Sequence, residues 1–155
     1  MPFGRARNSR WVAVLAVVVI PVLTVNARSH PERRAFARTT WDSVYSMPQA
    51  GRGESAYAKT CARCHGAALG GGDEATPLAG TTFLGNWNGQ ALSDLQKRII
   101  ETMPSDTVGI YDRKLVTDVI AFLLKSNGFP AGAADLTTEP DTLKTITFTV
   151  DKKTP

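Results

Sequence analysis

The chain has 155 residues, of which 43% are hydrophobic and 21% are charged, which suits one small domain and excludes both a disordered tail and a multi-span membrane protein. Its two cysteines are too few for a disulfide-rich scaffold. The formal net charge of +4 arises near the N-terminus, because residues 41–128 hold 8 Lys and Arg against 9 Asp and Glu, a balance of −1 that excludes a nucleic-acid-binding module.

The N-terminal residues have the three parts of a secretory signal. Three arginines precede an apolar run over residues 11–25, and the run ends at Val25-Asn26-Ala27, a small-residue pattern suited to cleavage after the alanine. The run is shorter than the roughly 20 residues that a membrane-spanning helix requires. We therefore predict a signal peptide over residues 1–27, with an uncleaved membrane anchor as the alternative. Both place the rest of the chain outside the cytoplasm, in the periplasm or tethered to the membrane facing it.

A basic segment without apolar periodicity follows, and we predict a flexible leader over residues 28–43. The first helix is predicted to begin at Ser46, which can cap it, with a proline in its first turn and Gln49 completing a capping box. This helix should run to about Cys61. Gly53 lowers the helix propensity there, which suggests that the residue is present for close packing.

A glycine-rich stretch over residues 66–89 shows no sustained helical or strand period. So long a loop in a small domain usually surrounds or binds something. The sequence Ser93-Asp94-Leu95-Gln96 repeats the capping-box pattern, so we predict a second helix from there. It should end before Met103-Pro104, because proline restricts the residue that precedes it.

A third helix is predicted over residues 112–126, which carry a wide apolar stripe, and Gly128 suits the left-handed position that ends such a helix. The predicted fold is therefore a small all-α domain over residues 44–128, followed by a mostly irregular tail over 129–155. Within the tail, Leu143 to Val150 alternates and predicts an edge strand. Three modest helices enclose little core for this length, which points to a bulky bound group.

The segment Cys61-Ala62-Arg63-Cys64-His65 has the C-x-x-C-H spacing of c-type haem attachment. Its two thiols can add to the two porphyrin vinyl groups, while the imidazole reaches the iron from one face. A dithiol oxidoreductase is the first alternative, but such a site follows a buried strand, and none is predicted before Cys61. Zinc is the second, but it needs further ligands, and the only other histidine is His30 in the leader. One covalent haem c is therefore the favoured cofactor.

An electron carrier usually has a second axial iron ligand, commonly a methionine thioether. Of the three methionines, Met1 leaves with the signal and Met47 begins the helix that carries the cysteines. Met103 is therefore the candidate, with a plain core role as the alternative. If the sixth position were open instead, the protein would be a haem enzyme or a gas sensor. His30 as the sixth ligand is disfavoured by its place in the leader.

Further residues are expected to surround the haem. The imidazole N–H of His65 needs an acceptor, and a carbonyl in the loop after the motif is the natural source. Leu78, which follows Pro77, is expected to contact the ring face. The indole N–H of Trp87 or the hydroxyl of Tyr57 is expected to hydrogen-bond a propionate.

Together these residues resemble a class I c-type cytochrome over about residues 45–128. The resemblance implies a helical fold around one covalent haem, with His65 and Met103 as axial ligands and Pro77 accepting a hydrogen bond from His65. More narrowly, the chain is similar to bacterial cytochromes linked to periplasmic dehydrogenases, including pyrroloquinoline-quinone types, in which the segment after Pro130 is a wrapping tail. The segments that carry this similarity are Cys61–Gly66, Pro77–Gly80, Phe83, Trp87 and Asn127–Gly132.

The combined prediction is an exported monohaem electron carrier rather than an enzyme, with the electron-accepting subunit of a dehydrogenase as the alternative. It would take single electrons from a periplasmic dehydrogenase and pass them to another cytochrome or an oxidase. Its partners would be redox proteins and not nucleic acid, with a membrane contact only if the N-terminal segment stays uncleaved. The near-neutral domain gives no strong electrostatic steering of a partner.

Overall fold

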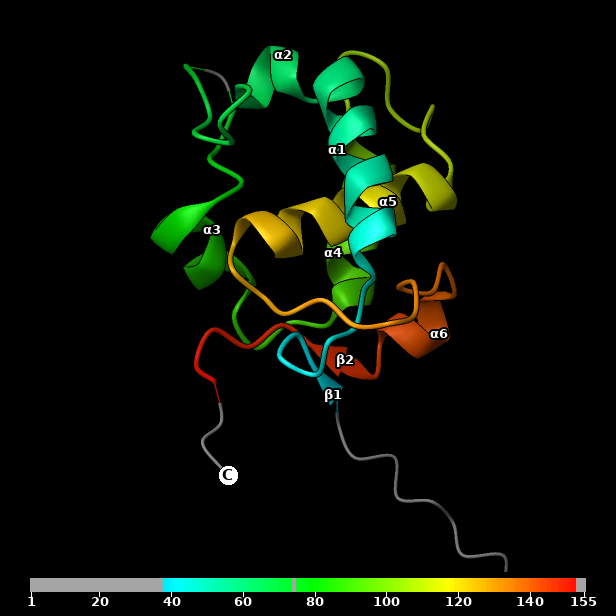
Figure 1. Cartoon of the computed structure of the whole chain (residues 1–155). Coiled ribbons are helices and arrows are strands. Elements are labelled where there is room, and N and C mark those ends of the chain that lie inside the picture. The colour runs from blue at the N-terminus through cyan, green and yellow to red at the C-terminus, as the bar shows by residue number, and fades with distance from the viewer. Residues whose placement is uncertain (1–37, 74, 153–155) are drawn as a thin grey trace, which may run out of the picture. The chain divides into compact units, whose positions relative to one another are not determined.

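The computed structural model describes residues 38–73 and 75–152. The predicted signal peptide, His30 and most of the predicted leader lie outside these residues. The described part is mostly helical, as expected (Figure 1). Its helices are α1 (Met47–Thr60), α2 (Ala62–His65), α3 (Gly80–Trp87), α4 (Leu92–Thr102), α5 (Arg113–Ser126) and α6 (Pro140–Leu143). The two short strands are β1 (Arg38–Thr39) and β2 (Ile146–Thr147), which pair in parallel.

Helix α1 begins where its capping residue predicts. The Ser46 hydroxyl accepts a hydrogen bond from the Gln49 backbone N–H at 3.1 Å, and the helix ends at Cys61. The second half of the predicted capping box is absent, because the Gln49 side chain bonds to the tail instead. Its amide donates to the Leu136 carbonyl at 3.0 Å and accepts from the Leu136 N–H at 2.6 Å. The start of α1 is thereby joined to the tail.

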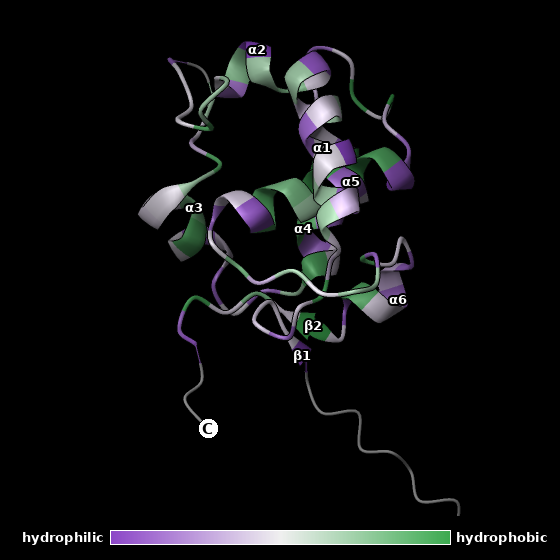
Figure 2. Cartoon of the chain, viewed as in Figure 1, coloured by the Kyte–Doolittle hydropathy of each residue, from purple (hydrophilic) through white to green (hydrophobic). Residues whose placement is uncertain are grey.

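Close packing of α1 against α5 explains Gly53. A Cβ atom added at Gly53 would lie 1.8 Å from the Asp118 carbonyl oxygen and 3.0 Å from the Phe122 Cβ. One turn further on, the Tyr57 ring packs against Phe122 with 5.3 Å between ring centroids. The predicted packing role of this glycine is confirmed. Figure 2 shows strongly hydrophobic residues on parts of α3, α4, α5 and β2, whereas α1 carries few; the buried residues of α1 are Gln49, Ala50, Gly53 and Tyr57.

One helix boundary differs from prediction, and one helix was not predicted. Helix α4 begins at Leu92, and its first turn is held by Asp94, whose carboxylate accepts from the Ala91 N–H at 3.2 Å; Ser93 is not the cap. Helix α3 lies inside the stretch expected to be a loop. It has only 8 residues, so its apolar pattern is too short to stand out in the sequence.

Tail residues hold α3 in place. The rings of Phe83 and Phe148 meet edge to face with 5.9 Å between centroids. The Phe148 N–H donates to the Gln90 carbonyl and the Gly89 N–H donates to the Phe148 carbonyl, both at 2.8 Å. A short helix with little propensity of its own thus becomes stable by packing against a segment that is distant in sequence.

Helix α5 is the central element. It begins after Asp112, whose carboxylate accepts from the Leu115 N–H at 2.8 Å, and it ends before Gly128, which has the predicted left-handed φ of 84°. Every residue from 116 to 124 is buried. None of the helices within the described residues is both long and apolar enough to cross a membrane.

The tail packs against the end of the domain at which β1 lies. Leu143, Ile146 and Phe148 are buried, but only Ile146–Thr147 forms a strand, which is shorter than the strand predicted over residues 143–150. Its partner β1 lies within the expected leader. The folded part therefore begins before the predicted boundary at residue 44.

Asp118 is a buried carboxylate on α5 that two cations hold. Arg52 donates from Nε and Nη2 to its two oxygens at 3.1 and 3.3 Å, and Lys114 Nζ donates at 2.9 Å. Burial by itself raises the pKa of Asp118, but the hydrogen bonds from Arg52 and Lys114 outweigh this effect and hold the pKa below its ordinary value.

A lowered pKa makes Asp118 stabilising above the unfolded-state value of about 3.9, and this stability is lost as pH falls through the folded value. We expect Asp118→Asn to lower the free energy of unfolding by about 1–3 kcal/mol near neutral pH and to flatten its decline below about pH 4. Hydrogen bonds from Ser46 and Arg52 also lower the pKa of Asp135. Some loss of stability with falling pH should therefore remain in Asp118→Asn. Denaturant titrations across this range measure the effect, with Asp151→Asn as the exposed control. An unchanged profile in Asp118→Asn would contradict the assignment.

Candidate haem site

An open cavity of about 940 Å³ lies between α2, α3, α4 and α5. It is at the upper end of the roughly 300–1,000 Å³ range of ligand pockets in proteins. Its lining includes all seven residues that the sequence singled out: Cys61, Cys64, His65, Pro77, Leu78, Trp87 and Met103. The fold thus brings together residues that are up to 42 positions apart in the chain (61 to 103).

His65 is held in one orientation by the loop that follows the motif. Its Nδ1 lies 2.9 Å from the carbonyl oxygen of Thr76. Because a carbonyl only accepts, the proton of the neutral imidazole sits on Nδ1, which leaves the lone pair of Nε2 for a metal. The expectation that Pro77 is the acceptor is wrong for this structure. Pro77 restricts Thr76 to extended backbone, which keeps the Thr76 carbonyl out of helical bonding, and Pro77 itself lines the cavity.

Two further bonds close this loop. The Tyr57 hydroxyl donates to the Gly66 carbonyl at 2.6 Å, and the Gly71 N–H donates to the His65 carbonyl at 2.9 Å. Tyr57 does not line the cavity, so its expected propionate contact is not supported. Burial, together with the nearby Cys61 thiolate charge, raises the pKa of Tyr57 to about 12. Gly71 is required here, because its φ is 77° and a Cβ would lie 2.5 Å from the Ala75 carbonyl oxygen.

The two cysteines are free thiols at the cavity wall. Cys61 is half-buried at the end of α1, and Cys64 is exposed. Burial raises the pKa of the Cys61 thiol, and a contact with the Thr60 hydroxyl partly opposes this. The motif follows a 14-residue helix and not a strand, so the setting that a thioredoxin-type dithiol requires is missing. Within the described residues, no group of three or more His, Cys, Asp or Glu side chains is arranged to hold a metal ion, as a zinc site would be.

Met103, the candidate second ligand, lines the same cavity as His65. It directly follows α4, is half-buried, and its N–H donates to the Ile99 carbonyl at 2.9 Å. Met47, by contrast, is 53% exposed and does not line the cavity. Of the methionines that the structure describes, Met103 is therefore the one that a ligand in the cavity can reach.

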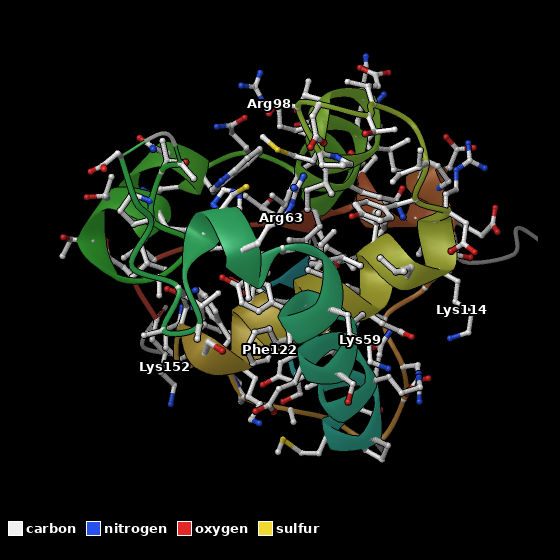
Figure 3. The ribbon with its side chains drawn as sticks, turned by 90° about the horizontal axis from the view of Figure 1, so that it is seen from above. Lys59, Arg63, Arg98, Lys114, Phe122 and Lys152 are labelled. Carbon is white, nitrogen blue, oxygen red and sulfur yellow. The ribbon has the colours of Figure 1, made fainter. Side chains whose placement is uncertain are left out.

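The cavity wall is apolar inside and charged at its edge. Apolar side chains line it from α3, α4 and α5: Phe83, Trp87, Leu95, Ile99, Val119 and Leu123. Three cations and three anions also line it: Arg63, Lys97, Arg98, Asp94, Glu101 and Asp106. Arg63 and Arg98 are labelled in Figure 3, where Arg63 extends from α2 toward the segment after α4. The charged side chains around the cavity therefore balance to zero.

Asn127, which the sequence analysis did not assign to the site, joins the end of α5 to the start of α3. Its amide donates to the Leu78 carbonyl at 3.0 Å and accepts from the Gly80 N–H at 3.0 Å. It thereby fixes the segment that includes Thr76 and Leu78. The sequence shows this asparagine only as a residue beside the glycine that ends a helix. Its bonding partners could not be read from it, because they lie 47 and 49 residues away.

The donor set fits haem c: two free thiols at C-x-x-C spacing, one imidazole with Nε2 available, one thioether and apolar walls. Residues 48–123 match the family model described as cytochrome c oxidase, cbb3-type, subunit III. Neither the comparison with curated proteins nor that with solved structures gave a match. The helical fold, the C-x-x-C-H motif and the family match together support a c-type cytochrome domain over this segment and, with it, haem-based electron transfer.

Proposed function

We propose that this protein is an exported monohaem cytochrome that carries single electrons from a periplasmic dehydrogenase to a respiratory acceptor. The observation that carries the proposal is the convergence of Cys61, Cys64, His65 and Met103 on one cavity. In this proposal the thiols attach the haem and His65 and Met103 bind its iron. Haem supplies a metal centre that cycles between two charge states.

The residues around the cavity have separate tasks. The Thr76 carbonyl fixes the orientation and the tautomer of His65, so that Nε2 faces the bound group without a proton. His65 and Met103 would both bind the iron, which would deny a substrate access to the metal. The apolar side chains from α3, α4 and α5 exclude water from the centre, so that little reorganises when its charge changes.

The partners are proposed to be redox proteins that meet the cytochrome in a small and short-lived contact. Val108 and Ile110 are two of the three large apolar side chains that are strongly exposed among the described residues. Residues on both sides of them, Asp106 and Tyr111, line the cavity. With the charges at the cavity edge balanced, we propose that the contact is mainly apolar and only weakly dependent on salt.

The export and the donor rest on sequence. The predicted signal peptide over residues 1–27 supports export to the periplasm, where haem is attached. The segments Pro77–Gly80 and Asn127–Gly132 support a dehydrogenase as donor through their similarity to dehydrogenase-linked cytochromes. The oxidase subunit named in the matched family description supports a respiratory acceptor.

Covalent haem attachment tests the proposal. Expressed in a host that attaches haem c, the purified chain should gain the mass of one haem and show the c-type α band when reduced. Cys61→Ser/Cys64→Ser should lose the covalent haem, because both thioether bonds are gone. The unaltered chain from a host without attachment machinery is the matched control and should be colourless. A colourless product from the competent host would overturn the proposal.

A further inference from the structure

An ion pair joins the haem motif to the segment that carries Met103. Arg63 lies on α2, between the two cysteines in the sequence. Its Nη2 donates to a carboxylate oxygen of Asp106, three residues after Met103. Both side chains line the cavity, and Figure 3 shows Arg63 directed toward this segment. The two residues are 43 positions apart, so the contact is a tertiary one.

The segment over residues 103–111 has few other polar contacts. The Met103 N–H bonds to Ile99, and the Thr107 N–H and hydroxyl bond to Pro104 and Asp106, all within the same stretch of chain. Across residues 38–73 and 75–152, the Arg63–Asp106 ion pair is the one hydrogen bond or ion pair that links this segment to a remote element. Residues 105–110 are exposed, so packing adds little there.

We infer that Arg63 and Asp106 are positioning residues whose ion pair holds the Met103 segment closed over the haem cavity. This inference rests on the proposed role of Met103 as iron ligand. The pair is exposed, with side-chain exposures of 61% and 55%, so it shifts the balance between closed and open segment without determining it alone. From the usual strength of exposed pairs, its loss should raise the open population about 1.5- to 5-fold.

The rate of carbon monoxide binding measures the fraction of molecules in which the Met103 segment is open, because carbon monoxide binds the reduced iron only when Met103 has left it. In the haem-loaded full chain, Asp106→Asn and Arg63→Gln should each speed carbon monoxide binding about 1.5- to 5-fold. Each should also lower the temperature at which the ferric methionine–iron absorption band disappears. The charge swap Arg63→Asp/Asp106→Arg should restore both readouts, since it rebuilds the pair in reverse. High salt should speed binding in the unaltered protein more than in the single variants.

Lys125→Gln is the matched control. It breaks another exposed pair, with Glu54, that joins α1 and α5 and does not line the cavity. Single variants that behave like the unaltered protein, or a charge swap that fails to restore it, would overturn the inference. Failure of the proposed function would give a different result from failure of this inference. An unaltered protein that lacks the methionine–iron band and binds carbon monoxide rapidly would show that Met103 is not a ligand.

Discussion

Replacing Met103 with alanine is expected to convert the site from one with two protein ligands to one with an open position. The ferric methionine–iron absorption band should vanish, and carbon monoxide should bind the reduced protein rapidly. The reduction potential should fall by about 0.1–0.2 V, because a thioether favours the reduced iron and axial ligands set potentials over a range of ~0.8 V. Optical spectra, a redox titration and stopped-flow binding measure the three effects.

Two further variants make this prediction specific. Met47→Ala removes a methionine that is 53% exposed and outside the cavity, so it should change none of the readouts. Met103→His keeps the position filled and should exclude carbon monoxide while the potential still falls, since imidazole donates more strongly than thioether. If Met103→Ala retains the methionine–iron band, a different ligand occupies the sixth position and Met103 is a core residue.

The largest loss of stability is expected from Gly53→Ala. The new Cβ would lie 1.8 Å from the Asp118 carbonyl oxygen, a backbone atom in the middle of α5 that cannot turn aside. Helices α1 and α5 would have to separate, and we expect the free energy of unfolding to fall by about 3 kcal/mol, the upper end of the usual cost of overpacking. Denaturant unfolding monitored by circular dichroism measures this.

The same helix provides the control. Gly51 is exposed two residues earlier, and a Cβ built there meets no atom within 4 Å. Gly51→Ala should therefore stabilise the protein by about 0.5–1 kcal/mol, because alanine has the higher helix propensity. Equal effects of the two substitutions would mean that the α1–α5 approach is looser than the structure has it.

The haem motif, the Ser46 cap of α1 and the bounds of α5 are readable from the sequence because the patterns behind them are local. The spacing of Cys61, Cys64 and His65 spans five residues, and Ser46 and Asp112 bond to backbone groups three positions away. The chemistry and the helices that carry it therefore follow from short patterns.

Met103 was predicted by elimination and not from a local pattern. Elimination among three methionines selects it, but only the fold places it at the same cavity as His65. The acceptor for His65 shows the limit of such reasoning. A carbonyl after the motif was expected, and Pro77 was named through resemblance, yet the hydrogen bond goes to the neighbouring Thr76. One residue of loop register decides between them, and Gly71 and Tyr57 set that register through bonds that no short pattern reveals.

What the sequence alone determined is the C-x-x-C-H spacing, the start of α1 at its Ser46 cap and the apolar face of α5. Tertiary structure alone decided that α3 is a helix, that the Gln49 side chain holds the tail, and that Arg63 reaches Asp106. The physical reason is the distance along the chain. A cap or a haem motif is satisfied within one turn, whereas these contacts join residues 43 to 87 positions apart and form only when the whole domain is packed.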